Sequence, residues 1–133
     1  YAHHPKEIKM TLDSLRSVTK EKLIVIFEPH RFSRILNLKD DFLNSFKNSN
    51  SIFVLPIYAA GEKIKKKFTN LHFSKLLKRK YKNKMIMSIN DQKTLNSSLK
   101  AIICNGDNVI FFGAGQSSKT AYSFVNFLKK NEV

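Results

Sequence analysis

Three side chains that could bind an anion lie close together in the sequence: His30, Arg31 and Arg34. An arginine guanidinium is planar and offers paired N–H donors that match a carboxylate or a phosphate. Two guanidiniums beside an imidazole therefore predict a site for a small anion. On spacing alone, solvated loop charges explain these residues equally well. Whether they form an anion site or are solvated charges depends on the strands and helices that position them.

The segment before these residues predicts a buried strand. Residues 23–27 form the apolar run Leu-Ile-Val-Ile-Phe, which is rich in β-branched side chains. Pro29 cannot donate a hydrogen bond to a sheet and therefore ends the strand. We expect His30, Arg31 and Arg34 just past the carboxyl end of this strand, where open parallel α/β sheets bind ligands.

Strand and helix patterns alternate along the rest of the chain. Further apolar runs predict strands at residues 52–55, 85–87 and 108–112. Amphipathic stretches predict helices that begin at Pro5, cover residues 38–46, and follow the glycine-rich turn at residues 113–115. The alternation predicts a three-layer, Rossmann-like α/β domain, with a mostly parallel sheet and helices on both of its faces.

The composition limits the class of protein. The chain has 133 residues, of which 42% are hydrophobic, and this suits one globular domain with a substantial core. Its net charge of +14 attracts polyanions without specificity. The lysines are dispersed, however, and no nucleic-acid recognition motif accompanies them. We expect no specific nucleic-acid partner, and a basic nucleic-acid-binding module stays open as an alternative.

The sequence predicts no membrane-spanning helix, no internal disulfide and no metal site in this chain. No apolar run approaches the ~20 residues of a membrane helix, so no membrane partner is expected. Cys104 is the single cysteine, which predicts a reducing, cytoplasmic setting, and its apolar neighbours predict a buried thiol. His3 and His4 are adjacent and point apart, with no further ligand at metal spacing, so we expect no metal here.

Several segments are expected to meet at the carboxyl edge of the sheet: residues 1–4, 30–34, 58–62 and 113–119. The turn Gly113-Ala114-Gly115 leads into a helix, where small residues allow a ligand to approach closely. The turn lacks the third glycine of a dinucleotide fingerprint and the Lys-Ser/Thr ending of a P-loop. Tight packing between helix and sheet explains the glycines as well as ligand contact does, and both interpretations stay open.

Four motifs, in order along the chain, resemble the Mur ligase family. Residues 1–8 contain Tyr-Ala-His-His-Pro followed by Glu-Ile, as in the family's Tyr-Gly/Ala-His-His-Pro-x-Glu-Ile element. Residues 27–34, Phe-Glu-Pro-His-Arg-Phe-Ser-Arg, are similar to its Phe-Gln-Pro-His-Arg-Tyr-Ser-Arg segment, with Glu28 and Phe32 as departures. Residues 58–62 resemble its Tyr-Ala-Ala-Gly-Glu turn, and residues 113–115 its Gly-Ala-Gly turn. The resemblance implies that residues 1–133 are the C-terminal, amino-acid-binding domain of a three-domain enzyme.

The resemblance also implies an activity. It is that of an ATP-dependent ligase of peptidoglycan biosynthesis, which joins L-alanine to UDP-N-acetylmuramate through an acyl phosphate. ATP and magnesium would be bound by the central domain and the UDP-sugar by the N-terminal domain. This domain alone would therefore hold no cofactor and be inactive. A sibling ligase that attaches a recycled peptide stays open as an alternative, although His30-Arg31 with Arg34 favours the alanine branch.

Carried over by position, the resemblance assigns the L-alanine carboxylate to Arg31 and Arg34, with His30 beside them. Tyr1 and His3 would line the same pocket. Further residues are placed near it, namely Tyr58, Gly113, Ala114 and Gly115. No residue of this domain alone is expected to be catalytic or to bind a metal. Holding the carboxylate would orient the amine, and positioning of this kind can contribute ~7 kcal/mol or more in favourable cases.

Overall fold

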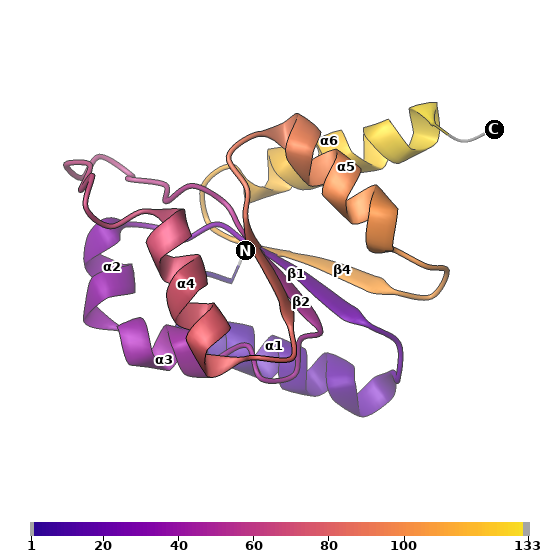
Figure 1. Ribbon diagram of the computed structural model, residues 1–133, viewed down its shortest axis with the longest axis horizontal. Helices are drawn as coiled ribbons and strands as arrows, with labels where there is room; N and C mark the ends of the chain where they lie inside the picture. The colour runs from indigo at the N-terminus through magenta and orange to yellow at the C-terminus, as the bar shows by residue number, and fades with distance from the viewer. Residues whose placement is uncertain (1, 132–133) are drawn as a thin grey trace.

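The computed structural model describes residues 2–131 of the chain, which form one α/β domain (Figure 1). The helices are α1 (Pro5–Val18), α2 (Phe32–Asn37), α3 (Lys39–Asn44), α4 (Asn70–Lys80), α5 (Gln92–Ile102) and α6 (Ser117–Lys130). The strands are β1 (Leu23–Phe27), β2 (Ser51–Val54), β3 (Met85–Ser88) and β4 (Asn108–Phe112). None of the described helices is long and apolar enough to cross a membrane.

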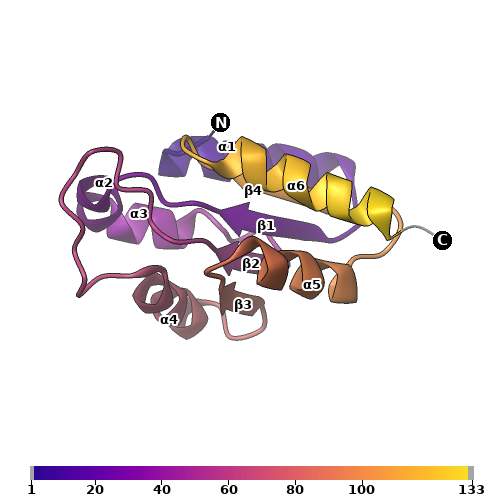
Figure 2. The same cartoon turned by 90° about the horizontal axis from the view of Figure 1, so that it is seen from above.

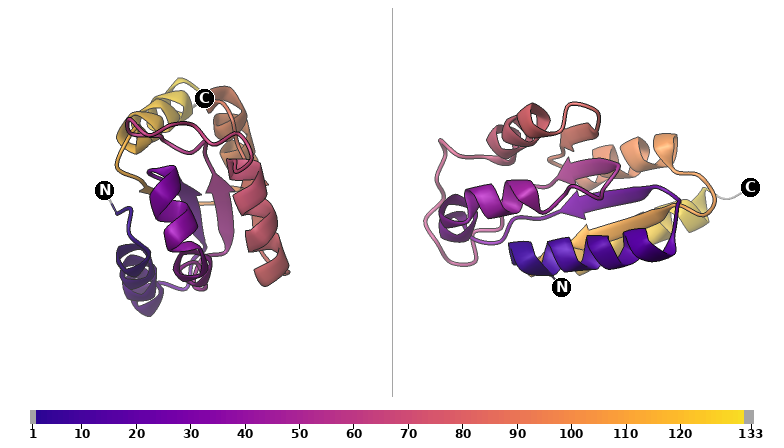
Figure 3. Two further views of the ribbon diagram at one scale, coloured as in Figure 1. Left: turned by 90° about the vertical axis from the view of Figure 1, so that its left-hand side faces the viewer. Right: turned by 90° about the horizontal axis from the view of Figure 1, so that it is seen from below.

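The strands form one parallel sheet in the order β3-β2-β1-β4. Val25 of β1 pairs with Ile52 of β2 on one side and with Ile110 of β4 on the other. The chain leaves β1 towards β2, and β4 joins the opposite side of β1 later. The carboxyl ends of β1 and β4 therefore flank the point where the strand order reverses, which is where open α/β sheets form a ligand crevice. Figure 3, left, looks onto this edge.

Helices cover both faces of the sheet, α5 and α6 on one side and α1 to α4 on the other (Figure 1), which confirms the predicted three-layer fold; Figure 2 looks onto the face covered by α5 and α6. Alternate residues of β1 supply the two cores: Leu23, Val25 and Phe27 face α1, α2, α3 and α4, whereas Ile24 and Ile26 face α5 and α6. Every residue of β1 is fully buried, as expected for the central strand of a parallel sheet. β1 is thus held rigidly from both sides, and so is the point at which it ends.

Two sequence expectations are wrong. The helix expected over residues 38–46 is present as α3, but residues 32–37, expected to lie in a loop, form the additional helix α2, because Phe32 and Ile35 bury their side chains. Arg34 therefore lies on α2 and not in a loop. Cys104 was expected to be buried but is exposed, since the chain turns there after α5 and the Cys104 amide donates to Asp107 Oδ2 at 2.9 Å.

The start of α1 is as the sequence predicts. Pro5 occupies the first turn, where a missing N–H costs nothing. His4 caps the helix by accepting the Lys6 amide at Nδ1, and Glu7 accepts the His4 amide at 3.1 Å. His4 therefore acts as a helix cap, and this places His3 beside the carboxyl edge of the sheet.

Asn70, the first residue of α4, ties together the ends of two strands. Its side chain is buried, and its amide donates to the carbonyl oxygens of Val54 at 3.1 Å and Ile89 at 3.2 Å. The same amide lies 3.0 Å from Asn90 Oδ1. This contact fixes the carboxyl ends of β2 and β3 relative to α4.

We predict that Asn70→Ala lowers the free energy of unfolding by about 2 kcal/mol, because buried strand-end carbonyls lose their donor. Urea denaturation of the chain measures this change. Leu71→Ala is the control, since Leu71 is 46% exposed and should change stability by no more than ~0.5 kcal/mol. Equal effects of the two substitutions would contradict the role given to Asn70.

Candidate functional site

The structure brings together most of the side chains that the sequence singled out. The His30 ring lies between the rings of His3, at a centroid distance of 5.6 Å, and Tyr58, at 5.5 Å. Arg34 Nη1 lies 3.3 Å from His30 Nδ1. Residues that are distant in sequence thus form one cluster just beyond the end of β1. Tyr1, which was expected to line the same pocket, lies outside the described residues.

Tyr58 fixes the backbone that carries His30 and Arg31. The Tyr58 amide donates to the Pro29 carbonyl, and the Arg31 amide donates to the Tyr58 carbonyl, both at 2.8 Å. His30 and Tyr58 consequently pair in parallel as an isolated bridge beyond β1 and β2. This local pairing holds the predicted anion-binding residues almost as firmly as a strand would.

Arg31 has an unusual backbone conformation, with φ at +71° and ψ at 130°. A side chain at such angles clashes with its own backbone, and the cost is of order 1–3 kcal/mol. The side chain is exposed at the start of α2. Strain of this kind persists where surrounding structure enforces it, often at functional sites, and here the hydrogen bond to Tyr58 enforces it.

The site has a net positive charge that its own carboxylates do not cancel. Within residues 2–131, neither Arg31 nor Arg34 forms an ion pair, since the ion pairs there join Lys9 to Asp13 and Lys22 to Asp107. The nearby Glu62 accepts hydrogen bonds from the Ser33 amide, at 3.1 Å, and from the Ser33 hydroxyl. These bonds lower the pKa of Glu62 and tie the loop at residues 58–62 to α2.

His30 contributes a neutral imidazole to this cluster. Its partial burial lowers its pKa, and the neighbouring charge of Arg34 lowers the pKa further. At neutral pH the ring therefore remains uncharged, and the positive charge of the site comes from the guanidiniums. Two guanidiniums beside a neutral imidazole are suited to hold one small carboxylate.

The glycine turn after β4 is packed by the chain's own side chains. A Cβ atom at Gly115 would lie 2.7 Å from Cγ and Cδ1 of Tyr58, and one at Gly113 would lie 3.0 Å from Cβ of Glu28. Of the two interpretations that the sequence left open, the structure shows tight packing. The turn, including Ala114, is linked to His30 through the Tyr58 ring.

Glu28 is the residue whose role the sequence did not reveal. It is only 5% exposed, and its Oε1 accepts the amide hydrogens of Gly115 at 3.1 Å and Gln116 at 2.9 Å. Burial raises its pKa, and these backbone donors offset part of that rise. One feature of the sequence could have indicated this role: Glu28 is a single acidic residue directly after a wholly apolar strand.

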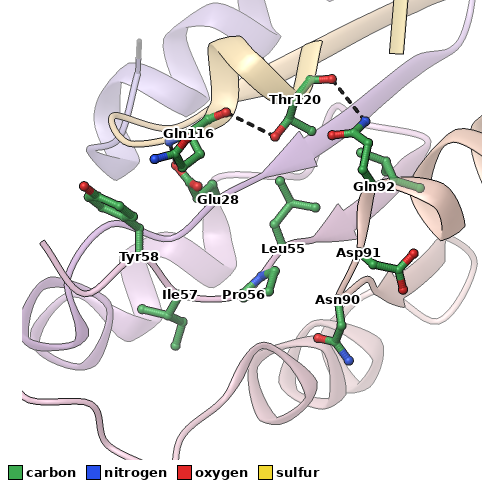
Figure 4. A pocket seen from close by; sticks show the side chains of 11 residues that line it. Glu28, Leu55, Pro56, Ile57, Tyr58, Asn90, Asp91, Gln92, Gln116 and Thr120 are labelled. Atoms are coloured by element: carbon green, nitrogen blue, oxygen red, sulfur yellow. Dashed lines mark hydrogen bonds between the residues drawn. The ribbon is translucent and has the colours of Figure 1, made fainter. Parts of the chain in front are cut away.

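A pocket of about 300 Å³ opens on the other side of Tyr58, between the starts of α5 and α6 (Figure 4). Polar side chains at and just before the starts of both helices line it, among them Asn90, Gln92 and Gln116. Thr120 links them, because its carbonyl accepts from Gln92 and its hydroxyl donates to the Gln116 carbonyl. No motif marks these residues, so the sequence did not predict this pocket. Within the described part of the chain, no group of three or more His, Cys, Asp or Glu side chains is placed to hold a metal.

The strain at Arg31 leads to a prediction about stability. At an ordinary position, alanine is more stable than glycine by ~0.5–1 kcal/mol. At Arg31 we expect the reverse, with Arg31→Gly more stable than Arg31→Ala by about 1 kcal/mol, because glycine tolerates positive φ. Urea denaturation compares the pair. At the helical control position Arg79 the ordinary order should hold, and the ordinary order at both positions would contradict the strain.

The buried Glu28 carboxyl leads to a prediction about pH. Its pKa is raised in the folded chain, so the stability it confers is present at low pH and is lost as pH rises through that pKa. Glutamine keeps the acceptor oxygen but does not ionise. Glu28→Gln should therefore be more stable than wild type at about pH 8, and the advantage should shrink towards about pH 4. Denaturation curves at both pH values test this, and an advantage that grows on acidification would contradict it.

Comparisons with known proteins identify the family of the chain. The family model described as "Mur ligase, glutamate ligase domain" matches residues 1–115. Similar curated proteins are named UDP-N-acetylmuramate--L-alanine ligase. The one from Pelagibacter ubique (strain HTCC1062) is 41% identical over 119 residues, covering 89% of this chain and 25% of the relative. Those from Fusobacterium nucleatum and Rickettsia canadensis are 36% and 39% identical, covering 97% and 98% of this chain and 26% and 27% of the relatives. The chain thus spans about a quarter of the length of these relatives.

A solved structure supports the fold. It is a domain from Haemophilus ducreyi 35000HP, described as belonging to a UDP-N-acetylmuramate:L-alanyl-gamma-D-glutamyl-medo-diaminopimelate ligase. The TM-score is 0.66 at 17% sequence identity, with 96% of this chain and 86% of that chain covered. At this identity the likeness concerns the fold alone. The family-model match over most of the chain, together with the motifs assembled around His30, shows that the chain belongs to the Mur ligase family.

Proposed function

We propose that this chain is the domain that positions L-alanine in a ligase joining L-alanine to UDP-N-acetylmuramate at the expense of ATP. The observation that supports it most is that Arg34 contacts His30 and that neither Arg34 nor the neighbouring Arg31 forms an ion pair within the described residues. Such a cluster fits the carboxylate of one small amino acid. The names of the similar proteins supply the reaction.

The geometry explains how the domain would contribute to the reaction. In the proposed reaction, ATP phosphorylates the muramoyl carboxylate, and the alanine amine attacks the resulting acyl phosphate. An amide forms, and ADP and phosphate are released. Arg31 and Arg34 would grip the alanine carboxylate so that the amine points away from the domain and towards the acyl carbon. The domain would thus act by orientation, which makes an intermolecular attack effectively intramolecular.

The other substrates fall outside this chain in the proposal. ATP, magnesium and the UDP-sugar would bind to other domains of the full-length protein, and a moving C-terminal domain would close onto them. A cytoplasmic location and a place in peptidoglycan synthesis are part of the same proposal. The expectations that this domain alone holds no cofactor and is inactive stay predictions.

The net charge of +14 offers a different function, binding of nucleic acid. Several of the cations contribute to the fold instead. Arg16 donates to the carbonyls of Glu21 and Asn48, and Lys84 donates to the carbonyl of Lys47 at 2.8 Å. DNA binding that survives high salt would favour the nucleic-acid function, whereas binding that disappears with salt would reflect charge alone.

We predict that Arg31→Ala in the full-length protein raises the KM for L-alanine roughly 10- to 100-fold, because one charge-assisted contact to the carboxylate is lost. The KM for ATP should stay within about twofold, since the proposed ATP site lies elsewhere. Steady-state release of phosphate measures both constants. Arg79→Ala is the control, because Arg79 is an exposed cation at the end of α4, away from the carboxyl edge.

An unchanged KM for L-alanine in the Arg31→Ala protein would refute the proposed role of this cluster. A wild-type protein that turns over ATP with a tripeptide but not with L-alanine would instead assign the chain to the sibling ligase that attaches recycled peptides.

A further inference from the structure

We propose that Glu28 is a positioning residue for the amino-acid site: through the turn at residues 113–116 and the Tyr58 ring, it holds His30 and Arg31 in their binding geometry. This inference rests on the proposed function. The Glu28 carboxyl group binds the turn after β4 and lines the neighbouring pocket, so we place its effect on the anion site through its neighbours. Three consecutive sets of contacts support the proposal.

The first contacts tie Glu28 to the turn after β4. Its backbone amide donates to the Phe112 carbonyl at 2.9 Å, and its Oε1 accepts the amides of Gly115 and Gln116. The side chain is almost fully buried. One residue therefore joins the end of β1 to the end of β4 and to the start of α6, across the point where the strand order reverses.

The next contact joins the turn to Tyr58. The space beside Gly115 is so narrow that a Cβ atom there would lie 2.7 Å from the Tyr58 ring and 2.9 Å from Glu28 Oε1. The Glu28 carboxyl group and the Tyr58 ring thus both lie against Gly115. If the carboxylate is removed, the turn loses the acceptor that sets its position, and the surface beneath Tyr58 is free to move.

The last contacts lead from Tyr58 to the anion site. The Tyr58 ring stacks on His30 with an angle of 24° between the planes, and the Tyr58 backbone forms hydrogen bonds with Pro29 and Arg31. Arg31 is strained, so its conformation depends on these contacts. A displacement of Tyr58 would change the direction in which the Arg31 guanidinium points, and small misplacements in a binding site are costly.

The geometry requires an acceptor at Glu28 and not a charge. The glutamine side chain has the same length and offers an acceptor oxygen to the same two amides. Alanine offers none. A role in positioning therefore predicts that glutamine preserves the site and alanine does not, whereas a role for the negative charge predicts that both substitutions fail.

The test measures alanine and ATP kinetics of full-length Glu28→Ala and Glu28→Gln, beside Arg31→Ala and wild type. We expect Glu28→Ala to raise the KM for L-alanine about tenfold or more with the KM for ATP within about twofold, and Glu28→Gln to stay within about twofold of wild type in both. Glu21→Ala is the matched control, because Glu21 is an exposed carboxylate before β1, at the opposite edge of the sheet. It should match wild type.

A readout independent of turnover accompanies the kinetics. In NMR spectra of the 133-residue chain, the His30 ring signals should shift in Glu28→Ala and stay in place in Glu28→Gln. If Glu28→Ala does not fold, Gly115→Ala replaces it, since the added Cβ pushes Tyr58 from the same turn. Gly115→Ala should also raise the KM for L-alanine and spare that for ATP.

The outcomes separate this inference from the proposed function. If wild type does not use L-alanine, or if Arg31→Ala leaves the alanine KM unchanged, the proposed function fails. If Arg31→Ala behaves as expected but Glu28→Ala or its replacement matches wild type, only the positioning role fails. Equal losses in Glu28→Ala and Glu28→Gln would likewise overturn it, because they would show that the charge is what matters.

Discussion

The candidate site depends on a short extension of the sheet beyond its regular strands. After β1 ends, residues 29–31 continue alongside Tyr58 through two backbone hydrogen bonds of 2.8 Å. These bonds fix the backbone of His30 and Arg31 and hold Arg31 in a conformation that it would not adopt alone. A ligand as small as an amino acid offers few contacts, so its site must be rigid before it binds. The extension supplies that rigidity.

The same edge distinguishes this chain from a dinucleotide-binding domain of similar fold. In such domains a glycine turn after a strand leaves the helix N-terminus open to a pyrophosphate. Here the Glu28 carboxylate accepts two amides of the turn, and the Tyr58 ring lies against Gly115. The anion-binding capacity of the turn is thus satisfied within the chain. In the proposed function, an external anion would instead find its donors after β1, at Arg31 and Arg34.

The sequence predicted what is local and periodic. The apolar run ending at Phe27 marked the central strand, and Pro29 marked its end, which was enough to place His30 and Arg31 at the carboxyl edge. The helix α2 was missed, because its two buried apolar residues, Phe32 and Ile35, lie in a short stretch that was expected to be a loop. Cys104 was misplaced, because its apolar neighbours belong to the end of α5, which stops at Ile102 before the thiol.

The role of Glu28 could not be predicted, because its partners lie 87 and 88 residues further along the chain. The strain at Arg31 could not be predicted either, since no glycine marks the position.

The central claim is that Arg31 and Arg34 hold the carboxylate of L-alanine. A crystal structure of the full-length protein with L-alanine, UDP-N-acetylmuramate and a non-hydrolysable ATP analogue tests it most directly. We expect the alanine carboxylate within hydrogen-bond distance of both guanidiniums, with the amine directed at the muramoyl carboxyl; a carboxylate held by other residues would contradict the claim.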